Sequence, residues 1–201
     1  MAIILDGTTG ITAPDITSAA GLDAADLTGT VASARLPAGS VLQVVTSVDT
    51  TETSFASDSW NDTTLTATIT PKLSNSKFIC FVTLGLSGDH GGAEGAGARL
   101  VRSLPPATAD TVCDGVNPSS WGCHMNVPGN QGVDPYAPQS CAFNVYDSPS
   151  VSAGTPIKYK LQIRGYSVSY PVYYNRGQNL DSDSNGRWQT AATLVIQEVA
   201  A

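Results

Sequence analysis

The sequence contains few charged side chains, and its basic residues do not gather into a patch. Asp, Glu, Lys and Arg make up 13% of the 201 residues, about half the share that is usual in soluble domains. The net charge is −7, and the ten Lys and Arg residues are scattered along the chain. Because binding through nucleic-acid phosphates requires clustered Lys and Arg, we expect no nucleic-acid partner.

Long hydrophobic runs and the signature of a secretory signal are also missing. No stretch of about 18 apolar residues occurs, so we expect no membrane insertion. The opening MAIILDGTTGITAPD has no basic region ahead of its short apolar run, as a signal peptide would. We therefore expect the chain to stay in the cytoplasm where it is made, or to leave it by lysis.

The residue patterns of common catalytic and metal sites are absent. The two histidines, His90 and His124, belong to no His-x₃-His or Cys-x₂-Cys spacing, and there is no G-x-S-x-G elbow. Glycoside hydrolysis needs a pair of carboxylates, but the chain has three glutamates and places most aspartates in turn-like segments. We therefore expect no enzymatic activity, no cofactor and no bound metal.

One polar segment matches the first half of a calcium-binding loop. Asp181, Asp183 and Asn185 fall at loop positions 1, 3 and 5, and Gly186 falls at position 6. The acid required at position 12 is replaced by Ala192. The alternative is a hairpin turn in which Asn185 and Gly186 supply positive φ angles. We favour the turn, so these residues are only weak metal candidates.

The four cysteines fall into two kinds of surroundings. Cys80 and Cys141 share the alternation phase of large apolar neighbours in strand-like segments, which favours two core thiols. Cys113 and Cys123 lie in the Gly/Pro/Asn-rich stretch CDGVNPSSWGC. They could form a disulfide that closes this loop if the protein reaches an oxidising medium.

The first 39 residues contain no Phe, Trp or Tyr, and their aliphatic residues are isolated. Such a segment cannot bury enough apolar surface to offset its ordering entropy, so we expect it to be disordered alone and ordered by other chains. We predict an extended arm and neck over residues 1–39, which docks on the virion and packs around a three-fold axis. The docking candidates are its N-terminal aliphatics, Ile3, Ile4, Leu5, Ile11 and Ile16.

From Ser40 onwards the sequence changes to alternating strand-like segments. The clearest is 157–164, in which Ile157, Tyr159, Leu161 and Ile163 share one face. No window shows a helical stripe, and turn signals separate about eight such segments. We predict an all-β, jelly-roll-like β-sandwich over residues 40–201. Its long loops should lie at 87–96 and in the Pro-rich span 104–139.

The aromatic residues permit two interpretations. Four tyrosines cluster in GYSVSYPVYYNR, while Trp121 and Tyr136 lie in the Pro-rich span. Alternation along strands would place the rings in the core or at a subunit interface. Tyr and Trp also dominate contact sites, and sugars stack on exposed rings. We favour the core or an interface for the cluster, and Trp121 and Tyr136 as receptor-contact candidates.

Several stretches resemble bacteriophage tail-fibre proteins. MAIILDGTTGITAPDITSAAG looks like the opening of many such fibres, and ADLTGTVASARLPAG resembles the linker repeated in them. The phrases YDSPSVSAGTPIKYKLQIRG and YYNRGQNLDSDSNG are similar to a β domain of fibre and virion-surface proteins of aquatic phages. The resemblance is strongest at 1–48, 64–86 and 146–201.

The resemblance implies a structural protein of the virion. It implies a homotrimer whose N-terminal arm binds other virion proteins, and whose β domain contacts a glycan or protein of the host surface. The alternative is a capsid decoration or head-fibre protein that stabilises or ornaments the head. Both expectations place the protein on the virion, assembled in the host cytoplasm.

Overall fold

A computed structural model describes most of the chain from residue 32 onwards. The described residues are 32–88, 95–106, 109–113, 122–127, 138–178 and 188–201. From Ser33 to Ala201 the chain forms one compact unit. The predicted arm and its docking residues Ile3, Ile4, Leu5, Ile11 and Ile16 lie outside the described residues.

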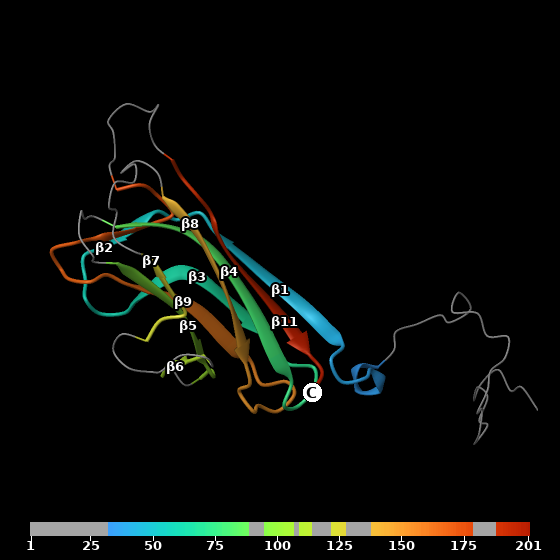
Figure 1. The fold of residues 1–201 in the computed structure, drawn as a ribbon. Coiled ribbons are helices and arrows are strands. Elements are labelled where there is room, and N and C mark those ends of the chain that lie inside the picture. Colours follow the sequence, from blue (N-terminus) through green and yellow to red (C-terminus); the bar gives the residue numbers. More distant parts are fainter. Residues whose placement is uncertain (1–31, 89–94, 107–108, 114–121, 128–137, 179–187) are drawn as a thin grey trace, which may run out of the picture. The chain divides into compact units, whose positions relative to one another are not determined.

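Two antiparallel sheets make up this unit (Figure 1). A short 3-10 helix, η2 (Ser33–Arg35), precedes the first strand. The first sheet contains β1 (Val41–Asp49), β2 (Thr53–Phe55), β4 (Lys77–Gly88), β8 (Gln139–Asp147), β10 (Val172–Tyr174) and β11 (Ala192–Val199). The second sheet contains β3 (Asn61–Ile69), β5 (Ala96–Ser103), β6 (Thr111–Val112), β7 (Met125–Val127) and β9 (Ile157–Arg164).

The strands pair in a nested order. β1 pairs with β11, β3 with β9, β4 with β8, and β5 with both β6 and β7. In the first sheet β11 also lies against β4, and in the second β9 also lies against β5. Nested antiparallel pairs that alternate between two sheets define a jelly roll. The predicted fold class, an all-β jelly-roll-like sandwich, is therefore confirmed for the described residues.

The core lies between the two sheets and follows the predicted alternation. The inward residues of 157–164, from Ile157 to Ile163, are fully buried, as are Leu65 and Ile69 on the neighbouring strand. Phe78 of the first sheet contacts Tyr159 of the second, with ring centroids 6.1 Å apart. Each sheet thus buries one face and leaves the other for water or a partner.

Three short strands were not predicted, and two of them correct the loop prediction for 104–139. β6 and β7 pair with β5 within that span, and Cys113, which follows β6, is 1% exposed in the core. β4 also continues to Gly88 and β5 starts at Ala96, which shortens the loop expected at 87–96. The third unpredicted strand, β2, pairs with β10.

The compact unit begins before Ser40, where the sequence predicted the boundary. The Gly39 amide donates to the Ala200 carbonyl at 2.9 Å, and the Ala200 amide donates to the Ser40 carbonyl at 2.9 Å. These bonds extend the pairing of the first strand with the last. Residues 33–40 therefore belong to the β domain, and they enter it at the end where β1 begins.

Buried carboxylates connect segments that are distant in sequence. At the end where the chain enters, Glu198 is fully buried and accepts hydrogen bonds from the Ser76 hydroxyl at 2.7 Å and the Lys72 amide at 2.8 Å. Inside the sandwich, Asp147 accepts bonds from the Arg102 guanidinium and, at 2.8 Å, from the Tyr159 hydroxyl. Charges buried with such partners fix the registers of neighbouring strands, since removing one partner leaves an unsatisfied group.

We expect Asp49 to make the domain sensitive to acid. Burial alone would raise the pKa of Asp49, but hydrogen bonds from Thr64, Thr51 and Tyr174 outweigh it and lower the pKa below the ordinary value. A carboxyl group whose pKa is lower in the folded than in the unfolded state stabilises the folded protein. This contribution is complete above about pH 4 and is lost as the pH falls through the folded-state pKa.

Asp49→Asn should therefore narrow the difference between the melting temperatures at pH 7 and pH 3. For a domain of this size, about 1 kcal/mol corresponds to a shift of about 2–4 °C. Asp58→Asn, which alters an exposed carboxylate, is the matched control and should leave the difference unchanged. The assignment is wrong if Asp49→Asn and the wild type lose equal stability in acid.

Candidate functional site

A cavity of about 280 Å³ opens at one end of the sandwich. The start of β3, the start of β5 and the end of β9 meet there, because Asn61 lies opposite Ile163 and Gly97 lies opposite Arg164. The chain enters the domain at the other end, where Val41 pairs with Val199. The side chains that line the cavity include Trp60, Cys123, Asn126, Arg164 and Tyr166.

A glycine within a strand lies in the lining of the cavity. Gly97 on β5 lies opposite Arg164 on β9 and opposite Asn126 on β7. A Cβ atom at Gly97 would lie 3.1 Å from Cη2 of Trp60 and 3.4 Å from Cβ of Cys123. Glycine inside a strand often marks a close approach of another group, and here it lets the Trp60 ring and Cys123 lie against the backbone of β5.

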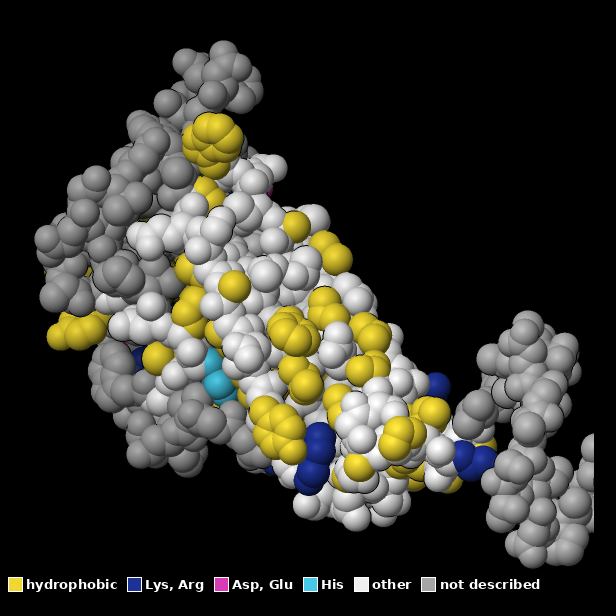
Figure 2. Space-filling model, turned by 45° about the vertical axis from the view of Figure 1, so that its right-hand side comes forward, with side chains coloured by type: hydrophobic (Ala, Val, Ile, Leu, Met, Phe, Trp, Pro, Cys, Tyr) yellow, Lys and Arg dark blue, Asp and Glu magenta, His cyan; other side chains and the backbone are white. Residues whose placement is uncertain are grey.

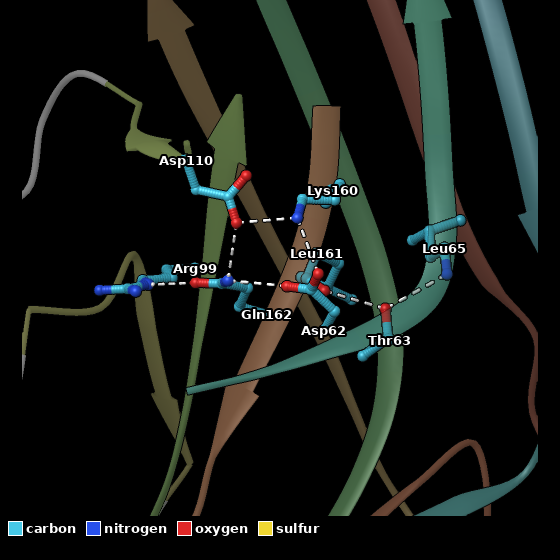
Figure 3. A network of polar contacts seen from close by, with 8 residues as sticks. All are labelled: Asp62, Thr63, Leu65, Arg99, Asp110, Lys160, Leu161 and Gln162. Carbon is cyan, nitrogen blue, oxygen red and sulfur yellow. Dashed lines mark hydrogen bonds and ion pairs between the residues drawn. The ribbon is translucent and has the colours of Figure 1, made fainter. Parts of the chain in front are cut away.

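A polar network lies on the outer face of the second sheet (Figure 3). Arg99, which belongs to this network, also contacts the ring of Trp60. The guanidinium carbon of Arg99 lies 4.2 Å from the centroid of the Trp60 ring, a cation–π contact. Nε of Arg99 donates to Oε1 of Gln162 at 2.8 Å, and Nε2 of Gln162 donates to Oδ1 of Asp62 at 2.7 Å. Lys160 forms ion pairs with Asp62 at 2.7 Å and with Asp110 at 2.8 Å.

The described lining of the cavity carries one charged side chain, and it is basic, although the whole protein is acidic. Arg164, which is only 9% exposed, is the charged residue among the described lining residues, and none of these is Asp or Glu. Burial lowers the pKa of Arg99, and the nearby charge of Arg164 adds to this effect while Asp110 and Asp62 oppose it. Arg99 itself is not among the lining residues, so its guanidinium belongs to the neighbouring network with Gln162, Asp62 and Asp110.

Of the residues and clusters singled out from sequence, Cys123, and Tyr166 of the tyrosine cluster, line this cavity. Trp121, Tyr136 and the weak metal candidates Asp181, Asp183 and Asn185 lie outside the described residues, so these assignments stay predictions. Of the tyrosine cluster, Tyr174 is buried in the core, as expected for part of it, whereas Tyr166 is 48% exposed at the cavity. Sequence reasoning missed Trp60 and Arg164. The sequence feature that could have indicated them is their position beside the ends of strands, which a jelly roll brings together.

The proposed pair of Cys113 and Cys123 is not a disulfide in the structure, where both are free thiols. Cys113 faces the core, whereas Cys123 lies beside Gly97 and Trp60 on the outer face of the same sheet. Burial raises the pKa of the Cys113 thiol, and likewise that of Cys80, which lies in the core as predicted. Cys141 is half-buried and packs against the core.

Comparison with known proteins gives no further assignment. The sequence matches no protein-family model, and no curated protein matches it either. Within the part of the chain that the structure describes, no helix has the length and hydrophobicity needed to cross a membrane. The same residues contain no group of three or more His, Cys, Asp or Glu that could hold a metal ion. Functional inference therefore rests on sequence patterns and on the geometry of the fold.

We expect thiol reagents to distinguish the four cysteines. In the native protein Cys123 and Cys141 should react first, because Cys80 and Cys113 are buried and their raised pKa values suppress the reactive thiolate. Mass spectrometry of the modified peptides reports the order, and Cys123→Ser should remove one fast site. A purified protein that shows a native bridge between Cys113 and Cys123 would contradict this arrangement.

Proposed function

We propose that the protein is a bacteriophage virion structural protein of tail-fibre type, which projects a trimeric β domain for attachment to the host surface. The observation that carries the proposal is a jelly-roll domain that the chain enters at one end and that has a cavity at the other. A domain joined to a particle at its entry end presents its far end to the surroundings. Residues 1–48 resemble the N-terminal segments of tail-fibre proteins, which supports an anchoring role for this part of the chain. No catalytic activity is part of this proposal.

The outer face of the first sheet supports self-association. Cross-strand register places outward side chains of β1, β11, β4 and β8 in rows, such as Val44, Gln197, Ile79 and Tyr146. Four large hydrophobic residues of this face are 41–61% exposed: Val44, Val48, Phe81 and Tyr146. Figure 2, with the β1 and β11 side of the sandwich brought forward, shows hydrophobic side chains gathered across the middle of the surface. Exposed apolar clusters of this kind mark interaction sites.

The two outer faces of the sandwich differ in charge, which indicates that the first is covered by protein. The second sheet presents the ion-paired network of Asp62, Asp110 and Lys160 to solvent. On the first sheet, Lys77 at the edge is the charged residue among the outward residues of β1, β11, β4 and β8. Depletion of charge is the compositional mark of an interface core.

A second copy of the chain is the occupant that this face fits. A surface made mostly of apolar residues and Thr, with Lys77 as its charged residue, needs little complementary charge, so identical surfaces can pack together around a closed symmetry axis. Four strands of about nine residues give a flat footprint of roughly 600 Å², and more accessible area once side-chain relief is counted. A stable interface buries about 800 Å² per partner, which is of the same order.

Phe81→Asp should therefore shift the protein from trimer to monomer without unfolding it. Phe81 is 41% exposed, so the carboxylate costs little in the free subunit but would be buried unpaired in the interface. Light scattering measures the mass, and thermal melting checks the fold. Thr68→Asp, on the outer face of the second sheet, is the matched control and should stay trimeric. A trimeric Phe81→Asp variant would show that the subunits meet elsewhere.

A capsid decoration or head-fibre protein is the second candidate function. The described residues form one jelly-roll domain and contain no shaft repeat, which suits a short projection on the head. Both candidates require an anchoring segment ahead of the domain. They differ in where the copies lie on the particle.

Deletion of residues 1–32 tests whether this segment anchors the protein to the particle. Because the compact unit begins at Ser33, we expect the shortened protein to melt cooperatively but to be missing from particles. The position of the copies on the particle distinguishes the tail-fibre from the decoration proposal. Electron microscopy of particles that carry labelled full-length protein should show the copies at the tail. Label spread over the head would replace the tail-fibre proposal by the decoration proposal, and incorporation of the shortened protein would refute the docking role of the arm.

A further inference from the structure

A histidine side chain takes the place of a backbone partner in the second sheet. On the side away from β9, β5 pairs first with β7 and then with β6, and Leu100 lies between these two pairings. The Leu100 carbonyl accepts from the Cys113 amide at 3.1 Å, and the Leu100 amide donates to Nδ1 of His124 at 3.1 Å. The backbone amide of His124 donates to the Ala98 carbonyl at 2.9 Å. The imidazole therefore fills the gap between the two strand pairings.

The same ring contacts the first sheet. It lies nearly parallel to the ring of Phe143 on β8, with centroids 5.6 Å apart and an angle of 9° between the planes. Phe143 is half-buried and packs against the core, as does Met125, the residue that follows His124. Aromatic rings in offset parallel geometry contribute stability beyond the burial of their area. His124 thus joins β5 and β7 of the second sheet to β8 of the first.

The hydrogen bond from Leu100 determines the protonation state of the ring. A backbone N–H can only donate, so Nδ1 of His124 must be the unprotonated nitrogen and the imidazole must be neutral, with its proton on Nε2. A proton added to Nδ1 would turn this acceptor into a donor. Two N–H groups would then face each other, and the Leu100 amide would lose its partner in a partly buried position.

The other titratable groups on the neighbouring elements do not change charge near neutral pH. The charged side chains on or beside β5, β6 and β8 have partners of their own: Arg99, Arg102, Asp110 and Asp147. Burial raises the pKa of the nearby thiols above its ordinary value: Cys113, Cys123 and Cys141. Tyr146 of β8 is exposed on the outer face of the first sheet, and Asp114 and Asp134 lie outside the described residues. Histidine, with an ordinary pKa of about 6.5, is the residue type here that gains charge between pH 7.5 and pH 5.

We propose that His124 is an acid-sensitive latch, which holds the two sheets together at this edge while its ring is neutral and releases the Leu100 amide when Nδ1 takes up a proton from solvent. The imidazolium must then turn away from Leu100 to reach water or another acceptor, and this turn takes it off Phe143. Cys123 and Asn126 flank His124 and line the cavity, so the wall that they supply loosens with the latch. The inference depends on the fold alone and goes beyond the proposed function.

The direction of the effect on stability follows from the hydrogen bond. The folded state binds the neutral ring, whereas the same histidine in the unfolded chain takes up a proton freely, so acid favours the unfolded state. The contribution of the latch is complete above the range in which free histidine titrates, and it is lost as the pH falls. Between pH 7.5 and pH 5 the melting temperature of the intact protein should fall by roughly 2–6 °C, the shift expected for the loss of one hydrogen bond in a domain of this size.

The variant His124→Asn separates the latch from simple packing. The amide oxygen of Asn lies two bonds from Cβ, as Nδ1 of histidine does, so it can still accept from Leu100 but takes up no proton in this pH range. The variant loses the contact with Phe143 and should be less stable at every pH, yet the fall in melting temperature between pH 7.5 and pH 5 should largely disappear. His90→Asn removes the other histidine of the chain and is the matched control, which should keep the wild-type fall. Equal falls in the wild type and His124→Asn would overturn the proposal.

NMR spectroscopy of the wild type tests the latch even if His124→Asn does not fold. Labelling with ¹⁵N-leucine makes the Leu100 amide visible, and Leu100→Ile identifies its signal by removing it. On acidification the Leu100 amide proton should move upfield, because a hydrogen bond deshields it, and should do so in step with the ring signals of His124. The amide of Leu194, in the core strand β11, is the internal control and should not move. A His124 ring that does not titrate between pH 7.5 and pH 5, or that titrates without moving the Leu100 signal, would overturn the proposal.

Discussion

Burial of one face of each sheet against the other is the interaction on which the rest of the structure depends. The strands that supply this core are paired in a nested order, so that Val41 at the start of the domain lies opposite Val199 near its end. No contiguous part of the chain can bury its apolar face alone, and the entropy of ordering the whole domain must be offset at once. Such non-local pairing predicts slow, cooperative folding. The buried carboxylates of Asp49, Asp147 and Glu198 depend on this core, because each accepts hydrogen bonds from segments that only the complete sandwich brings together.

Once the inner faces are fixed, the two outer faces are free to differ, and they do. The second sheet exposes a network of ion pairs and amides that water can solvate and that contacts Trp60 through Arg99. The first sheet exposes valines, Phe81 and Tyr146 with almost no charge. An antiparallel sheet in water usually alternates apolar and polar residues, so an outer face that is largely apolar differs from this pattern. This difference is the observation on which we base the proposal that the protein associates through the first sheet.

The fold was largely predictable from the sequence because its signal is local. The alternation in VLQVVTSVD and ATLVIQEV locates β1 and β11 to the residue, and the absence of helical stripes leaves a sandwich as the remaining class. The strands that were missed, such as β6 and β7, have two or three residues, too few for alternation to show. The burial of Cys113 was missed because it follows from pairing with β5, not from its Gly- and Pro-rich neighbours. The cavity was missed for the same reason, since Trp60, Gly97 and Arg164 meet only through the register of three strands.

The two proposed surfaces are compatible in a single assembly, and their geometry relates them. The outer face of the first sheet extends along the strands, whereas the cavity lies at the end of the domain away from the entry of the chain. Three copies packed through that face with their strands roughly along the axis would place three cavities at the same end. A small group bound in a cavity of this size is held weakly, because few atoms make contact. Contact of three such sites with one host surface can raise the overall affinity by about 10²–10⁴ without any new contact. A trimeric particle protein can therefore attach firmly through shallow sites, each of which stays weak enough to release.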